Sequence, residues 1–174
     1  MKYILLLITI LAAPGGLAAR ERLPELKVVE QFDVNRGSGT WYETARITHW
    51  FQRGLVCATA GYSVLPNGKL SILNTARKGR ADGKLETASY TAKIVDKLTN
   101  AKVSVTYFWP LSAEFYIIDL GEDYEYAVVG EPKRKYLWIL SRTARMDPEV
   151  YNGILERLKE QGYDPVNIEM TPQE

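Results

Sequence analysis

Between residues 40 and 142 the sequence alternates apolar and polar residues in short runs, and turn residues separate one run from the next. Alternation with a period of two is typical of half-buried β-strands. Pro66-Asn67-Gly68 marks one tight hairpin, because an Asn-Gly pair accepts the positive φ angles of a type I′ turn. Asp82-Gly83, Gly121-Glu122-Asp123 and Glu131-Pro132-Lys133-Arg134 mark further turns. This pattern predicts an all-β fold of consecutive antiparallel strands.

Eight strands are expected from the pattern. Their predicted bounds are Thr40–Ile47, Leu55–Leu65, Lys69–Arg77, Lys84–Val95, Lys102–Phe108, Glu114–Leu120, Glu125–Gly130 and Lys135–Arg142. Eight sequential strands joined by short turns favour an up-and-down β-barrel, because closure removes the edges of the sheet. A barrel of eight strands leaves an interior that holds one small ligand.

One helix should follow the strands. Asp147 is a candidate N-cap, Pro148 suits the first helical position, and Gly162 suits the position after the helix end. The apolar face of this helix would consist of Val150, Ile154, Leu155 and Leu158. We expect the helix to pack on the outside of the barrel, and Val166–Met170 to add a short strand.

The N-terminus has the features of a processing signal. Lys2 precedes an apolar run, Tyr3–Ala13, that is too short for a comfortable membrane span, and small residues precede the charges that begin at Arg20. We expect a signal peptide over residues 1–19, cleaved after Ala18 or Ala19, and a single domain over residues 20–174. The alternative is an uncleaved membrane anchor. Because no Cys lies at the junction, we expect a periplasmic or secreted protein without a lipid anchor.

The composition excludes some classes of partner. With 22 Lys and Arg against 21 Asp and Glu, nothing favours nucleic acid, which needs a concentrated basic stripe. The only Cys, Cys57, cannot form an intrachain disulfide, which favours a bacterial periplasm. The only His, His49, is expected to be a polar loop residue, because a metal site needs several ligands. No metal and no cofactor is expected.

Aromatic residues fall where loops are expected. Trp50 and Phe51 lie in the long connection Thr48–Gly54 after the first strand. Phe108 and Trp109 lie in the long connection Phe108–Ser112, which starts at the last residue of the fifth predicted strand. In an up-and-down barrel these two connections share one end. Two apolar loops at one end indicate the mouth of a cavity for an apolar ligand. The open alternatives are a plug in which the loops pack on each other, a homodimer contact and a peripheral membrane contact.

Three motifs in this order resemble the lipocalin family. Gly39-Thr40-Trp41 is similar to the Gly-x-Trp motif that opens the first strand, and Asp123-Tyr124 falls at the turn where the family has Asp-Tyr. Arg142 ends the last strand, where lipocalins carry an Arg that packs across the Trp. The resemblance covers roughly residues 28–170 and is strongest to bacterial outer-membrane lipoprotein-type lipocalins and to apolipoprotein D. Physically, a guanidinium stacked on an indole gains cation–π attraction, so we assign Trp41 and Arg142 to stability.

The resemblance implies an eight-stranded antiparallel barrel with one C-terminal helix outside, and a cavity for a fatty acid, lysophospholipid or similar lipid. Tyr62, Asn74 and Trp138 match the cavity pattern of apolipoprotein D. By alternation, Ala58 and Ala60 share a face with Tyr62, Tyr136 and Leu140 share a face with Trp138, and Cys57 faces outward. We also hypothesise that Glu43 points inward and hydrogen-bonds a tyrosine or the headgroup of a ligand.

The predicted function is therefore carriage of one apolar ligand, without catalysis. An enzyme on the same barrel is the alternative, and it would need an inward nucleophile or an acid–base pair. A small outer-membrane barrel would instead need an apolar outer face and a polar lumen, and it has no place for the terminal helix.

Overall fold

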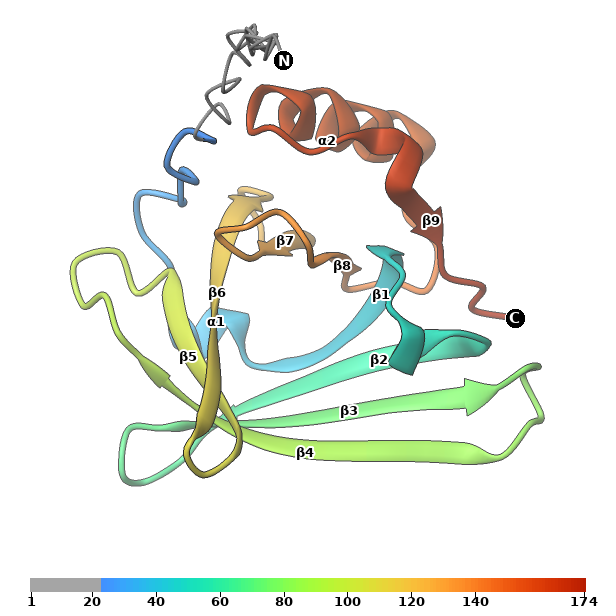
Figure 1. Ribbon diagram of the computed structural model, residues 1–174, viewed down its shortest axis with the longest axis horizontal. Coiled ribbons are helices and arrows are strands. Elements are labelled where there is room, and N and C mark those ends of the chain that lie inside the picture. The colour runs from blue at the N-terminus through green and yellow to red at the C-terminus, as the bar shows by residue number, and fades with distance from the viewer. Residues whose placement is uncertain (1–22) are drawn as a thin grey trace, which may run out of the picture.

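The computed structural model describes residues 23–174, so the expected signal peptide lies outside the described residues. Within that range, one antiparallel sheet has the strand order β2-β3-β4-β5-β6-β7-β8-β1-β9, and β1 also pairs with β2. This second pairing closes the first eight strands into a barrel (Figure 1). The strands are β1 (Gly39–Ile47), β2 (Leu55–Val64), β3 (Leu70–Lys78), β4 (Leu85–Ile94), β5 (Lys102–Phe108), β6 (Leu111–Leu120), β7 (Tyr126–Gly130), β8 (Leu137–Ser141) and β9 (Ile168–Met170).

The eight predicted barrel strands are confirmed, but one predicted connection is wrong. β6 begins at Leu111 instead of Glu114, and Phe108 of β5 pairs with Leu111. The connection is therefore only Trp109-Pro110, a tight hairpin with a cis peptide bond, where the sequence suggested a long loop. The predicted end of the fifth strand at Phe108 agrees with β5, but the prediction also counted Phe108, Leu111 and Ser112 in the connection, and these residues belong to paired strands.

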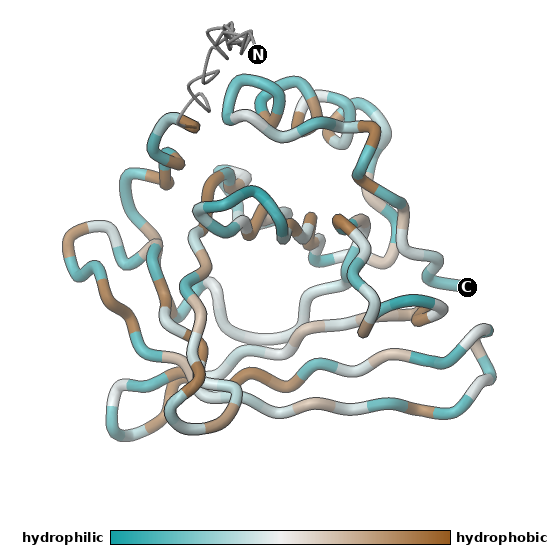
Figure 2. Tube along the Cα trace, in the orientation of Figure 1, coloured by the Kyte–Doolittle hydropathy of each residue, from teal (hydrophilic) through white to brown (hydrophobic). Residues whose placement is uncertain are grey.

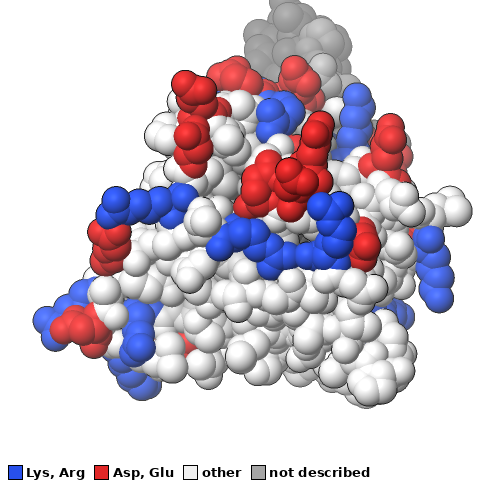
Figure 3. Space-filling model, turned by 180° about the vertical axis from the view of Figure 1, so that it is seen from behind, with Lys and Arg blue, Asp and Glu red and all other residues white. Residues whose placement is uncertain are grey.

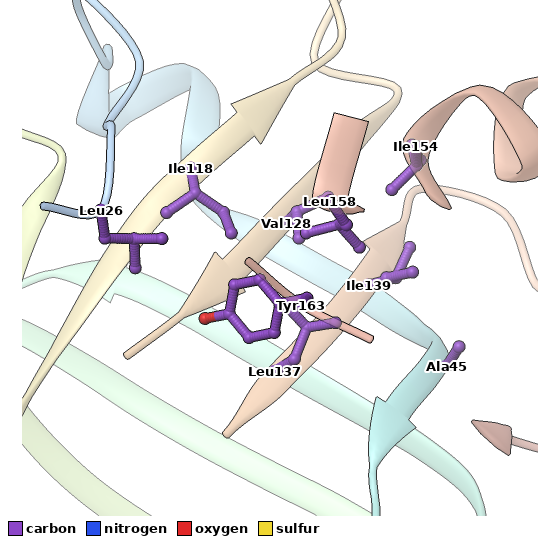
Figure 4. Packing of buried hydrophobic residues seen from close by; sticks show 9 residues of the cluster. All are labelled: Leu26, Ala45, Ile118, Val128, Leu137, Ile139, Ile154, Leu158 and Tyr163. Carbon is purple, nitrogen blue, oxygen red and sulfur yellow. The ribbon is translucent and has the colours of Figure 1, made fainter. Parts of the chain in front are cut away.

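The predicted helix is confirmed as α2 (Pro148–Glu160). The Asp147 carboxylate accepts hydrogen bonds from the backbone N–H groups of Glu149 and Val150 at 2.7 and 3.3 Å. These bonds satisfy two donors that the first helical turn leaves without partners. The helix lies outside the barrel, and its apolar face packs on β6–β8 and β1 (Figures 1 and 4). The buried cluster between them consists of Leu26, Ala45, Ile118, Val128, Leu137, Ile139, Ile154, Leu158 and Tyr163.

Three short helices were not expected from the sequence. They are α1 (Val34–Gly37) and the 3₁₀ helices η1 (Trp50–Gln52) and η2 (Pro165–Asn167). The last of these shortens the predicted strand at Val166–Met170 to the three residues of β9, which pair with β1. Within residues 23–174, no helix is both long enough and apolar enough to span a bilayer.

The strands alternate between hydrophobic and hydrophilic residues, as Figure 2 shows by colour. On the face seen in Figure 3, charges of both signs lie interspersed, mainly over the upper part of the molecule that carries α2. The lower part of that face, where β2–β4 lie, is largely uncharged except at one corner. In the barrel, alternation along each strand decides which side chains are buried. Outside the barrel, the buried side chains of α2 form one apolar stripe.

The wall of the barrel is irregular between β1 and β2. Direct pairing ends at Tyr42 and Thr59, and each strand has a bulge beyond that point. The C-terminal segment lies in the resulting gap: the N–H of Thr171 donates to the Thr44 carbonyl at 2.9 Å, and the N–H of Cys57 donates to the Pro172 carbonyl at 2.6 Å. The C-terminus thereby completes the wall of the barrel at this end.

Candidate functional site

One end of the barrel is closed by the predicted pair of Trp41 and Arg142. The guanidinium carbon of Arg142 lies 3.7 Å from the centre of the Trp41 ring, and the indole N–H donates to the Gly37 carbonyl of α1 at 2.8 Å. Arg142 also donates to the carbonyls of Thr40 and Arg36 at 3.1 and 2.5 Å. Burial lowers the pKa of Arg142 from its usual value, which lies far above neutral pH. The pair therefore joins the first and last strands of the barrel, β1 and β8, to the short helix α1, which covers this end of the barrel.

The predicted Asp-Tyr motif lies at the same end. The Tyr124 hydroxyl accepts a hydrogen bond from the backbone N–H of Asp33 at 2.7 Å, and the Arg36 guanidinium lies 4.1 Å from its ring centre. Asp123 is exposed, and its backbone N–H donates to the Glu125 carboxylate at 3.1 Å. Tyr124 thus holds the segment around α1 over the end of the barrel.

A cavity of about 620 Å³ runs through the barrel from α1 to η1. Pockets of this size bury most of the surface of a drug-sized ligand. The lining is mostly apolar and aromatic. It includes Val34, Trp41, Ala58, Ala60, Tyr62, Leu70, Ile72, Ala76, Val103, Val105, Phe115, Ile117, Ala127, Val129, Trp138 and Leu140.

The structure brings together several of the predicted site residues. Tyr62, Asn74 and Trp138 all line this cavity, and Asn74 is also open to solvent. Ala58 and Ala60 line it on the same strand as Tyr62, as alternation predicts, and their small side chains leave room for a ligand. Burial, helped by the nearby Glu43 charge, raises the pKa of Tyr62 to about 12, so its phenol is neutral at neutral pH.

Glu43 lies on the cavity wall, and Arg46 lies beside it. Each residue is only 6% exposed, and an Arg46 nitrogen lies 2.6 Å from a Glu43 carboxylate oxygen. The sequence analysis missed Arg46, because residues three apart on a regular strand face opposite sides. The bulge between Glu43 and Ala45 changes the phase of β1, so both side chains face inward. The sequence analysis proposed an inward Glu43, but the inward position of Arg46 follows only from the bulge.

The residues predicted to form the cavity mouth lie at the end of the barrel opposite Trp41 and Arg142, but they differ in whether they line the cavity. Phe51 lines the cavity, whereas Trp50 lines a second hollow of about 540 Å³ beside the cavity. Phe108 and Trp109 line neither and are 68% and 88% exposed. Trp50 is 80% exposed. The end of the barrel near η1 therefore has an exposed aromatic rim, which we define as Trp50, Phe108 and Trp109.

Tyr136 and His49 connect this rim to the barrel. The Tyr136 ring stacks on Trp138 at 6.0 Å between ring centres and lines the second hollow instead of the cavity. His49 stacks on Tyr136 at 4.0 Å, and its Nε2 donates to the Lys135 carbonyl at 2.7 Å. His49 thereby holds the connection before η1 against the turn between β7 and β8.

Cys57 lies in the bulge of β2 with a φ angle of +51° and does not line the cavity. The sequence analysis expected Cys57 to face outward, and its absence from the cavity lining is consistent with that expectation. Among the described residues, no three His, Cys, Asp or Glu side chains are grouped so that they could hold a metal ion.

A closed antiparallel barrel with an apolar cavity, a sealed end and an external helix defines a class of small ligand-binding barrels. The lipocalin-like domain model matches residues 32–173, and the chain belongs to this family, whose members generally bind small hydrophobic ligands. The predicted membership of the family is thereby confirmed.

The relatives agree with this assignment. The chain is 37% identical over 137 residues to outer membrane lipoprotein Blc of Escherichia coli, covering 79% of this chain and 77% of that one. It is 32% identical over 187 aligned positions to apolipoprotein D of Macaca fascicularis, covering 100% and 97%. Insecticyanin from the tobacco hornworm Manduca sexta has the same fold, with a TM-score of 0.68, 19% identity and coverage of 85% and 84%.

Proposed function

We propose that this protein binds and carries one slender apolar molecule, such as a lipid with a single long chain, inside the barrel. The observation that carries the proposal is the cavity of about 620 Å³, with an apolar lining and one buried polar group. Burying each methylene of an alkyl chain contributes about 0.8 kcal/mol. A chain of lipid length therefore supplies enough affinity to offset the cost of association.

The proposed role is binding without turnover. Among the described residues that line the cavity there is no Cys and no His, which are the common nucleophiles and bases of enzymes. Glu43 is paired with Arg46, and Tyr62 stays protonated at neutral pH. These groups suit the orientation of a ligand better than the transfer of protons.

We further propose that the aromatic rim touches a lipid surface while ligand is exchanged. Trp side chains favour the boundary between apolar and polar phases, because they have an apolar body and one polar N–H. Two of the relatives are named as an outer membrane lipoprotein and an apolipoprotein. Their names support a protein that works next to lipid. We also propose that the protein is exported to the periplasm or secreted, without a lipid anchor.

A chain-length series tests the proposed function. We expect the affinity of the delipidated protein for linear alkyl compounds, measured by quenching of tryptophan fluorescence, to rise about fourfold per added methylene until the cavity is full. Ala60→Phe, which puts a ring into the cavity, should move this limit to shorter chains. Ala144→Phe, at an exposed position outside the barrel, is the matched control. Absence of saturable binding for every chain length would refute the proposal.

A further inference from the structure

The buried pair of Glu43 and Arg46 is the main charged group on the wall of the cavity, and its hydrogen bonds are unequally distributed. Arg46 donates from Nε to the Thr48 hydroxyl at 3.3 Å, and from one terminal nitrogen to the carbonyls of Gln52 and Leu55 at 3.1 and 2.9 Å. Its other terminal nitrogen donates to Glu43 at 2.6 Å. Four of the five N–H donors of the guanidinium therefore have partners.

Because a single N–H remains, Arg46 cannot grip a ligand carboxylate in the two-bond arrangement that makes arginine a strong carboxylate receptor. A fatty acid that reached this point would bring its negative charge close to the Glu43 carboxylate. In a water-poor cavity that repulsion is stronger than in solvent. The pair therefore does not form a site for a carboxylate end.

Glu43 offers a free position for a hydrogen-bond donor. Its Oε1 accepts from Arg46 at 2.6 Å and from the Thr171 hydroxyl at 2.7 Å. Its Oε2 has one partner within the described residues, the Gln52 amide at 3.4 Å, which is longer than a good hydrogen bond. A carboxylate oxygen with such weak coordination is costly in a residue that is more than nine-tenths buried, and Glu43 lines the cavity.

We propose that the polar end of the natural ligand is a hydroxyl that donates a hydrogen bond to Oε2 of Glu43. This inference rests on the proposed function and specifies its ligand class: a long apolar molecule that ends in a neutral hydroxyl, not in a carboxylate. An ammonium end fits less well, because it would add a third charge to a pair that is already neutral. Thr171 and Arg46 act as positioning residues, since both donate to Oε1 and leave Oε2 with only the long contact to Gln52.

Three probes of equal chain length test this proposal on the unmodified protein: dodecan-1-ol, its methyl ether and dodecanoate at neutral pH. The ether keeps the oxygen but loses the donor. Because a hydrogen bond to a charged group is worth about tenfold or more in affinity, we expect the alcohol to bind about tenfold more tightly than the ether. Dodecanoate should bind most weakly. An ether or a carboxylate that binds as tightly as the alcohol would overturn the proposal.

The variant Glu43→Gln identifies the group responsible. We expect it to reduce the preference for alcohol over dodecanoate by about tenfold, because the like charge is gone. Glu156→Gln, on the outer helix, removes a carboxylate without changing the cavity and should keep the preference. If the unmodified protein binds all three probes without the expected order, only this proposal fails. If it binds none of them, the proposed function fails as well.

Discussion

Replacing Arg142 by Ala should destabilise the barrel more than any ordinary surface substitution. Arg142 stacks on the Trp41 ring at 3.7 Å and donates to two backbone carbonyls, those of Thr40 and Arg36. Cation–π attraction at a partly desolvated site contributes about 1–2 kcal/mol. Hydrogen bonds from a charged donor contribute about 1.5–3 kcal/mol each, and partial exposure of Arg142 reduces this. We expect a total loss of about 2–4 kcal/mol, a large part of the stability of a typical domain.

Thermal unfolding followed by circular dichroism measures this effect. For a domain of this size the midpoint should fall by about 5–15 °C. Arg142→Lys keeps the charge but loses the planar stack, so it should lose roughly half as much. Arg145→Ala is the matched control, because Arg145 is exposed and its ion pair with Glu174 at 2.9 Å should contribute about 0–1 kcal/mol. Equal midpoints for Arg142→Ala and Arg145→Ala would refute the role of the closing pair.

Three further outcomes follow from the structure. Gly37→Ala should lower the midpoint of urea unfolding by the equivalent of about 1–3 kcal/mol, because the added Cβ would lie 2.2 Å from the ring of Phe32; an unchanged midpoint would contradict the packing of the closed end. The pKa of Tyr62 is raised to about 12, so its neutral phenol contributes stability below pH 10 that is lost as the pH rises toward 12. The free energy of unfolding of Tyr62→Phe should therefore fall less between pH 10 and pH 12 than that of the unmodified protein. An unchanged alkaline transition would count against burial of the phenol. Trp109→Ser should weaken partition into phospholipid vesicles about tenfold in a sedimentation assay, whereas Leu98→Ser, 91% exposed at the other end, should not; equal partition of the two variants would exclude the rim as the contact.

The fold was predictable because its main determinants are local. Period-two alternation, an Asn-Gly turn and a capped apolar helix each act within a few residues, and each agrees with the others. The stacked pair of Trp41 and Arg142 was also expected, because both residues lie in motifs that resemble those of lipocalins. The resemblance to apolipoprotein D implied that Tyr62 and Trp138 line a cavity, and alternation then placed Ala58 and Ala60 on the same face as Tyr62.

The polar group in the cavity was only half predictable. Glu43 was expected to point inward, but Arg46 was not, because strict alternation places it on the outer face. The bulge that brings it inward depends on pairing with β8 on one side and on the C-terminal segment on the other. Contacts between residues more than a hundred positions apart, such as Thr171 with Glu43, leave no local pattern in the sequence.

The aromatic rim shows a second limit of sequence patterns. Phe108 and Trp109 were assigned to a long loop at a cavity mouth, whereas they lie at the end of a tight hairpin and outside the cavity. Alternation gives no signal for where a strand stops when its last residues are exposed and apolar. The two-residue turn is defined by the pairing of Phe108 with Leu111, for which the sequence pattern gave no signal.

A crystal structure of the protein with an alkyl alcohol that carries bromine on its last carbon tests the central claim most directly. We expect one anomalous bromine peak inside the barrel, among the side chains that line the cavity near Tyr62 and Trp138. A peak found only on the outer surface, at the aromatic rim or against α2, would contradict carriage inside the barrel.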